Sequence, residues 1–150
     1  MNELVIFHDE LLKNKIELHL LSIMQTVLTP TSHRQKEIAK QYLTELDKHI
    51  SELKSGKAER AMEIREFVQL MHLHPVHLSN TIKEVTGQST CELYEERLLR
   101  ISKELLSSTN LTISQIARQL TYDPSNFTKF FKHCSGITPK KFREQLHSGE

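Results

Sequence analysis

The second half of this chain repeats itself with a period of 49 residues. A step of that length pairs apolar residues with apolar residues, a proline with a proline and a glycine with a glycine. Two copies are too few for a solenoid of stacked repeats. The pattern therefore predicts one small unit present twice. The pairs are Ile64/Ile113, Phe67/Ile116, Val68/Ala117, Met71/Leu120, Leu73/Tyr122, Pro75/Pro124, Leu78/Phe127, Ile82/Phe131, Lys83/Lys132 and Gly87/Gly136.

Each copy carries the signals that begin and end a helix. His74 and Asp123 stand at the N-cap position, each directly before a proline. Proline is favoured at the first helical position because the N–H that it lacks has no intrahelical acceptor there. Gly87 and Gly136 suit the left-handed conformation that ends a helix. A short apolar helix precedes each cap, which gives the helix-turn-helix layout, whose second helix enters the DNA major groove.

The whole chain has helical periodicity, so we expect an all-α fold. Two helix-turn-helix subdomains, over about 63–87 and 112–136, are joined by a long linker helix over about 90–106. An N-terminal helical hairpin, with helices over about 3–28 and 33–53, precedes them. The apolar face of the first of these helices is wider than a coiled-coil seam, so it must be buried. We expect that N-terminal segment, residues 1–45, to serve dimerisation or packing.

Charge is unevenly distributed along the chain. The formal net charge is +1, but residues 109–150 carry six Lys and Arg against three Asp and Glu, a net of +3. A local positive field favours a polyanionic partner more than the overall sum suggests. No apolar run approaches the roughly 20 residues of a membrane span, and the N-terminus lacks the pattern of a signal peptide. The expected location is the cytoplasm, with no membrane partner.

Metal binding and catalysis have little support in the sequence. His74 and His77 have ligand spacing, but His74 is expected at a helix cap, and no fourth ligand lies nearby. Cys91 and Cys134 have no CxxC spacing, so we expect free thiols. No paired carboxylates, nucleophile–base set or glycine-rich phosphate loop is present. We therefore expect no enzyme activity, no catalytic residues, no metal site and no cofactor.

The candidate DNA contacts lie on the front of the two second helices. Asn can form two hydrogen bonds with adenine, Lys can reach guanine or phosphate, and Ser or Thr can serve several bases. Two basic residues near the start of the last helix, Lys140 and Arg143, are candidates for phosphate contact. The front-face candidates are Val76, Ser79, Asn80 and Lys83 in the first copy and Ser125, Asn126, Thr128, Lys129 and Lys132 in the second.

Residues from about 46 to 146 resemble the C-terminal DNA-binding domain of AraC/XylS-type bacterial transcription regulators. The resemblance is strongest over 123–143, where Phe127, Gly136 and Pro139 fall in the pattern of that family. It implies that residues 46–150 form a bilobed helical domain with base contacts from both second helices. Carried over by position, those contacts are Val76, Ser79, Asn80 and Lys83, then Ser125, Thr128, Lys129 and Lys132.

The expected function is that of a sequence-specific, DNA-binding transcription regulator. It would contact two successive major grooves of double-stranded DNA with its two recognition helices. RNA polymerase and a second copy of the chain, held through the N-terminal helices, are candidate partners. The alternative is a helical protein–protein interaction module that acts on another regulator. A piece of a longer regulator is a third possibility.

Overall fold

The computed structural model describes residues 31–147, and every regular element in that range is an α-helix. Residues 33–147 belong to one compact body. The all-α prediction is confirmed. None of the helices in the described range has the length and apolar character needed to cross a membrane. The helices are α2 (His33–Lys54), α3 (Ile64–Leu70), α4 (Pro75–Thr86), α5 (Thr90–Ser108), α6 (Ile113–Gln119), α7 (Pro124–Ser135) and α8 (Pro139–His147).

Helix α2 belongs to the compact body along its full length. Its buried stripe includes Ile38, Ala39 and Tyr42, and the helix packs against α4 and α5. The predicted domain boundary after residue 45 therefore falls inside a continuous helix, because apolar residues before that point are already part of the core. The predicted helix over 3–28, and with it the N-terminal hairpin, lies outside the described residues.

The 49-residue repeat is present in the structure as two helix-turn-helix units. We call α3 with α4 the first unit and α6 with α7 the second unit. Each short helix begins with a capping box, at Glu63 in the first unit and Thr112 in the second. Asp123 accepts hydrogen bonds at the start of α7, and His74 accepts one at the start of α4. With their capping residues, the first unit runs from Glu63 to Gly87 and the second from Thr112 to Gly136.

The turn within each unit has the same backbone conformation. His72 and Thr121, 49 residues apart, have positive φ angles of 51° and 65°. After each of them the chain bonds back to the preceding helix. The N–H of Leu73 donates to the Val68 carbonyl at 3.0 Å, and that of Tyr122 donates to the Ala117 carbonyl at 2.8 Å. Non-glycine residues are uncommon in this left-handed region, so the shared turn is a specific feature of the repeat.

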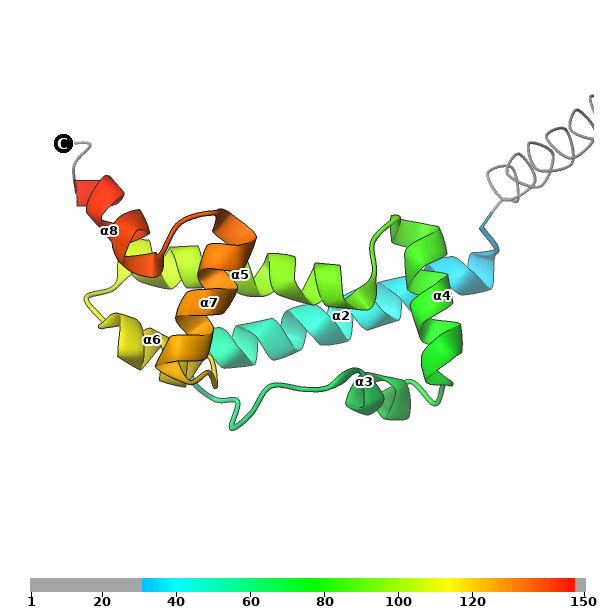
Figure 1. The fold of residues 1–150 in the computed structure, drawn as a ribbon. Helices are drawn as coiled ribbons and strands as arrows, with labels where there is room; N and C mark the ends of the chain where they lie inside the picture. The colour runs from blue at the N-terminus through cyan, green and yellow to red at the C-terminus, as the bar shows by residue number, and fades with distance from the viewer. Residues whose placement is uncertain (1–30, 148–150) are drawn as a thin grey trace, which may run out of the picture. The chain divides into compact units, whose positions relative to one another are not determined.

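Helix α5 serves both units. It contacts α2 and α4 of the first half and α6, α7 and α8 of the second. Its long run beside α2 is tied by two ion pairs, Arg97 to Asp47 and Lys54 to Glu104, each at 2.6 Å. Figure 1 shows α4 at one end of this α2–α5 pair and α7 at the other. The α2–α5 pair thus holds both helix-turn-helix units.

The core is continuous from α2 to α8 and rich in aromatic side chains. Tyr42 meets Phe67 edge-on, with ring centroids 5.4 Å apart. In the second half, Phe131 lies 6.0 Å from Phe127 and 5.6 Å from Phe142 by ring centroid. Phe127 and Phe131 are fully buried. Because each such side chain contributes roughly 1.5–3 kcal/mol on burial, these contacts fix how α7 sits on α5.

Candidate nucleic-acid interface

The two recognition helices, α4 and α7, lie on the same side of the α2–α5 pair. In Figure 1, α4 lies across α2 and α7 lies across α5, and both run in the same direction from the turn that precedes them. The 19 residues of α5 span roughly 28 Å at 1.5 Å per residue. That length is close to the spacing of about 34 Å between successive major grooves on one face of DNA. The arrangement places two capped helices on one side of the α2–α5 pair.

The outer face of α7 carries the polar residues predicted from the sequence. Ser125, Asn126, Lys129 and Lys132 are exposed, and Thr128 is half-buried. The hydroxyl group of Thr128 donates to the carbonyl of Pro124, four residues back, at 2.9 Å. The exposed positions therefore offer an amide and two ammonium groups above a buried phenylalanine layer.

The outer face of α4 is less polar. Val76 is 60% exposed. Asn80 and Lys83 are exposed, and Ser79 is half-buried. Val76 and Asn80 lie one helical turn apart, so an apolar and an amide contact stand side by side. Methyl groups of thymine are contacted by apolar side chains in this way.

The two basic residues predicted at the start of the last helix differ in their surroundings. Lys140 is exposed, with its Nζ 3.9 Å from Glu144. Arg143 is half-buried, and its Nε–H donates to the Leu106 carbonyl at 3.2 Å. That bond ties α8 to the last turn of α5, where unpaired carbonyls favour a cation. Arg143 therefore links two helices, and its Nη2 atom is buried without a hydrogen-bond partner.

One acidic residue next to the outer face of α4, Glu92, was not among the candidate residues predicted from the sequence. The Oε2 atom of Glu92, in the first turn of α5, lies 3.9 Å from the Nζ of Lys83. A signal for it exists in the sequence, because Ser89 and Glu92 have the spacing of a capping box. The 49-residue step also places Lys141 at the corresponding position of the second half.

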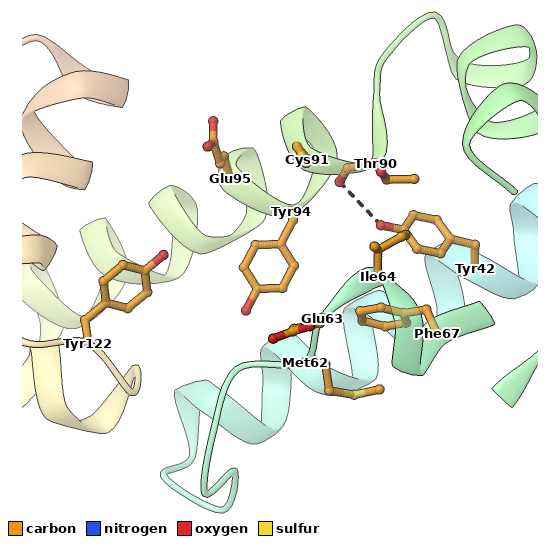
Figure 2. Close-up of a pocket in the computed structure, with 10 residues that line it drawn as sticks. All are labelled: Tyr42, Met62, Glu63, Ile64, Phe67, Thr90, Cys91, Tyr94, Glu95 and Tyr122. Atoms are coloured by element: carbon orange, nitrogen blue, oxygen red, sulfur yellow. Dashed lines mark hydrogen bonds between the residues drawn. The ribbon is translucent and has the colours of Figure 1, made fainter. Parts of the chain in front are cut away.

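A cavity of about 380 Å³ lies between the α3 end of the first unit and the turn of the second. Figure 2 shows Tyr94 of α5 at its centre, with Tyr122 on one side and Glu63 below. The hydroxyl of Tyr94 is buried without a hydrogen-bond partner. Burial raises the pKa of Tyr94 and of Tyr122, so both phenols stay protonated. The lining residues are Tyr42, Met62, Glu63, Ile64, Phe67, Thr90, Cys91, Tyr94, Glu95 and Tyr122.

The remaining chemistry-bearing residues form no cluster in the part of the chain that the structure describes. Residues 31–147 contain no group of three or more side chains placed to hold a metal ion. His74 acts as the predicted cap, accepting the Val76 N–H on its Nδ1 at 3.3 Å. Cys91 and Cys134 are free thiols, as the sequence predicts. Burial raises the pKa of the Cys134 thiol, which disfavours the reactive thiolate form.

Comparisons with known proteins agree with this geometry. A family model described as a helix-turn-helix domain matches residues 67–145. The uncharacterized HTH-type transcriptional regulator YfiF of Bacillus subtilis is 29% identical over 142 residues, which cover 91% of this chain and 44% of YfiF. The arabinose operon regulatory protein of Escherichia coli is 27% identical over 136 residues, which cover 90% of this chain and 41% of that protein. The chain thus spans less than half the length of these two relatives.

Among solved structures, the C-terminal domain of AraT, a response regulator from Geobacillus stearothermophilus, is similar in fold. Its TM-score is 0.64 at 26% sequence identity, and the match covers 78% of this chain and 88% of that domain. Residues 67–145, which the helix-turn-helix family model matches, include both recognition helices, α4 and α7, and the linker helix α5 between them. The repeat, the geometry and these similarities together show that the chain belongs to the AraC-type helix-turn-helix family.

Proposed function

We propose that this chain binds double-stranded DNA through α4 and α7 and thereby regulates transcription. One observation carries the proposal: two recognition helices, with caps and turns at corresponding positions, stand on one side of the α2–α5 pair. The helix between them, α5, is roughly 28 Å long, which is comparable with the spacing of about 34 Å between successive major grooves. The names of the relatives, a transcriptional regulator and an operon regulatory protein, support the same function.

Base recognition comes from both recognition helices. Asn80 and Asn126 are exposed and can each form a pair of hydrogen bonds with adenine. Val76 supplies an apolar contact for a thymine methyl group, and Lys129 reaches guanine or a neighbouring phosphate. The full proposed set is Val76, Ser79, Asn80, Lys83, Ser125, Asn126, Thr128, Lys129 and Lys132.

Phosphate contacts orient the domain on the duplex. Lys132 and Lys140 are exposed, as is Lys141 beside the latter, and all three belong to the basic C-terminal part of the chain. Each phosphate that a lysine neutralises releases counterions, so binding weakens steeply with salt. The basic second half is expected to supply most of that dependence.

The wider setting follows from the same proposal. A DNA-binding regulator acts by binding and not by catalysis, and in bacteria it acts in the cytoplasm, where the DNA is. RNA polymerase is a candidate partner of the bound domain. The N-terminal segment, whose first 30 residues lie outside the described range, is proposed to pair with a second copy of the chain.

The test is a fluorescence-anisotropy titration of the full chain against a duplex recovered from a random DNA pool. The variant replaces Lys129 and Lys132 by alanine. Each lost phosphate contact lowers affinity by roughly 8-fold at 0.1 M salt. The double variant is therefore expected to bind about 60-fold more weakly, with a salt slope reduced by about 1.8.

A matched control replaces two exposed lysines of α2, Lys40 and Lys48, by alanine. They lie on the side of α2 away from its buried stripe, so the change in net charge is the same but the location differs. Equal losses in both variants would contradict recognition through α7. Absence of binding to any member of the pool would reject DNA binding and favour a helical protein–protein interaction module.

A further inference from the structure

The two halves of the repeat differ sharply in charge although their backbones agree. The windows 63–92 and 112–141 correspond residue by residue in the 49-residue register. The first holds two Lys and Arg against four Asp and Glu, a net of −2. The second holds five against one, a net of +4. Two units of one geometry thus present opposite charge to the same partner.

The difference is concentrated where the helix after each recognition helix begins. Oε2 of Glu92 accepts the Ser89 N–H at 2.6 Å, and the hydroxyl of Ser89 accepts the Glu92 N–H at 3.2 Å. Hydrogen bonding of the Glu92 carboxylate to the backbone and side chain of Ser89 is the main reason that the pKa of Glu92 lies below its usual value, so the carboxylate is ionised. In the second half, Thr138 caps the N–H of Lys141 at the same 3.2 Å. One position carries a carboxylate and its counterpart an ammonium group.

Glu92 also lies next to the outer face of the recognition helix α4. Its carboxylate lies 3.9 Å from Nζ of Lys83, and both side chains are more than half exposed. The neighbouring Glu84 accepts a hydrogen bond from the Gln35 amide. The positions that correspond to Glu84 and Glu92 in the second half are His133 and Lys141. Lys83 therefore has a carboxylate within 4 Å, whereas the position that corresponds to this carboxylate in the second half carries the ammonium group of Lys141.

We propose that Glu92 keeps the first unit from gripping the phosphate backbone, so that the second unit anchors the duplex. The inference rests on the DNA-binding function proposed above. A carboxylate near the last turn of α4 repels phosphates there and partly neutralises Lys83, while Lys141 attracts phosphates at the matching place. The first unit then contributes base contacts, from Val76 and Asn80, with little phosphate binding.

Glu92 has a structural role as well, since its carboxylate closes the capping box. Glutamine also closes such a box, so Glu92→Gln removes the charge and keeps the cap. Glu92→Lys gives the first unit the charge of Lys141. Glu37→Lys is the matched control, because Glu37 is exposed on α2, nearly opposite its buried stripe. Thermal unfolding followed by circular dichroism verifies that each full-length variant is folded.

Binding is measured by anisotropy with the duplex recovered from the random pool, between 0.05 and 0.3 M salt. At 0.1 M salt, Glu92→Lys is expected to bind roughly 20-fold more tightly than Glu37→Lys, because one new phosphate contact contributes about 8-fold and relief of repulsion about twofold to threefold, with a salt slope steeper by about 0.9. Glu92→Gln, which only removes repulsion, is expected to gain about twofold to threefold. Lys141→Glu is expected to lose about 8-fold.

The outcomes separate this inference from the function on which it rests. Equal affinity of Glu92→Lys and Glu37→Lys, in a chain that binds DNA through Lys129 and Lys132, would overturn the role of Glu92 alone. A gain for Glu92→Lys without any gain for Glu92→Gln would also overturn it, because repulsion by the native carboxylate would then be absent. Failure of every variant and of the native chain to bind would reject the proposed function itself.

Discussion

His49 should make the stability of the domain depend on pH near neutrality. It is 3% exposed, its ring stacks on Tyr94 at a centroid distance of 6.2 Å, and its Nε2 accepts the Met62 N–H at 3.1 Å. Protonation would replace this acceptor with a second donor. Desolvation by burial is the main cause that lowers the pKa of His49, which outweighs the opposite effect of Glu52 and Glu66.

The sign and size follow from proton linkage. The unfolded chain binds a proton at His49 with an ordinary pKa of about 6.5, while the folded chain resists it. Stability from this group is therefore complete above pH 6.5 and is lost as pH falls toward the lowered folded-state pKa. At pH 5.5 the loss has a ceiling of about 1.4 kcal/mol. For a body of this size that corresponds to a fall in Tm of about 5 °C.

The assay is thermal unfolding of the full chain from pH 7.5 to 5.5, beside the variant His49→Gln. The glutamine amide oxygen can accept the Met62 N–H and does not titrate. Hydrogen bonds hold the carboxyl pKa values of Glu66 and Glu92 below their usual range, so those groups titrate below this window. Native protein should lose stability on acidification, and the variant should lose less. Parallel pH profiles for the two proteins would refute the reasoning.

Two further predictions concern the capping residues at the ends of the recognition helices. His74→Asp should stabilise the chain by about 0.5–1 kcal/mol, because aspartate is among the best N-cap residues and Asp123 fills that position in the second unit with two hydrogen bonds. An unchanged urea midpoint would contradict this. Gly136→Ala should destabilise by about 1 kcal/mol, because φ there is 81° while nothing within 4 Å would meet the added methyl group. A loss above about 3 kcal/mol would show that clashes of the added methyl group with its surroundings, and not the positive φ angle, determine the destabilisation.

Periodicity and cap signals were sufficient to predict most of the fold. The proline and glycine positions located α4 and α7 because those residues act through the local backbone, which a sequence displays directly. The domain boundary was less accessible. Residues 33–45 continue the same amphipathic helix as 46–54, and periodicity alone does not tell which partner covers an apolar stripe.

Side-chain roles were harder to predict where they depend on another element. Arg143 was predicted from its basic neighbours as a phosphate contact, and its bond to the carbonyl of Leu106, 37 residues earlier in the chain, had no signal in the sequence. The left-handed turn residues, His72 and Thr121, gave no signal because neither is glycine. Glu92 was detectable as a cap but not as a neighbour of Lys83, since that contact requires the bend between α4 and α5.

The two copies agree where the backbone requires it and differ where the surface is exposed. Their caps, turns and terminal glycines stand at corresponding positions, but the outward residues of α4 and α7 differ. In the 49-residue register, Ser125 takes the position of Val76, and Lys129 takes that of Asn80. Because base recognition depends on these side chains, the two helices cannot prefer the same bases. Under the proposed function, one chain therefore presents two different recognition surfaces to adjacent grooves, and its site needs neither a direct repeat nor a palindrome.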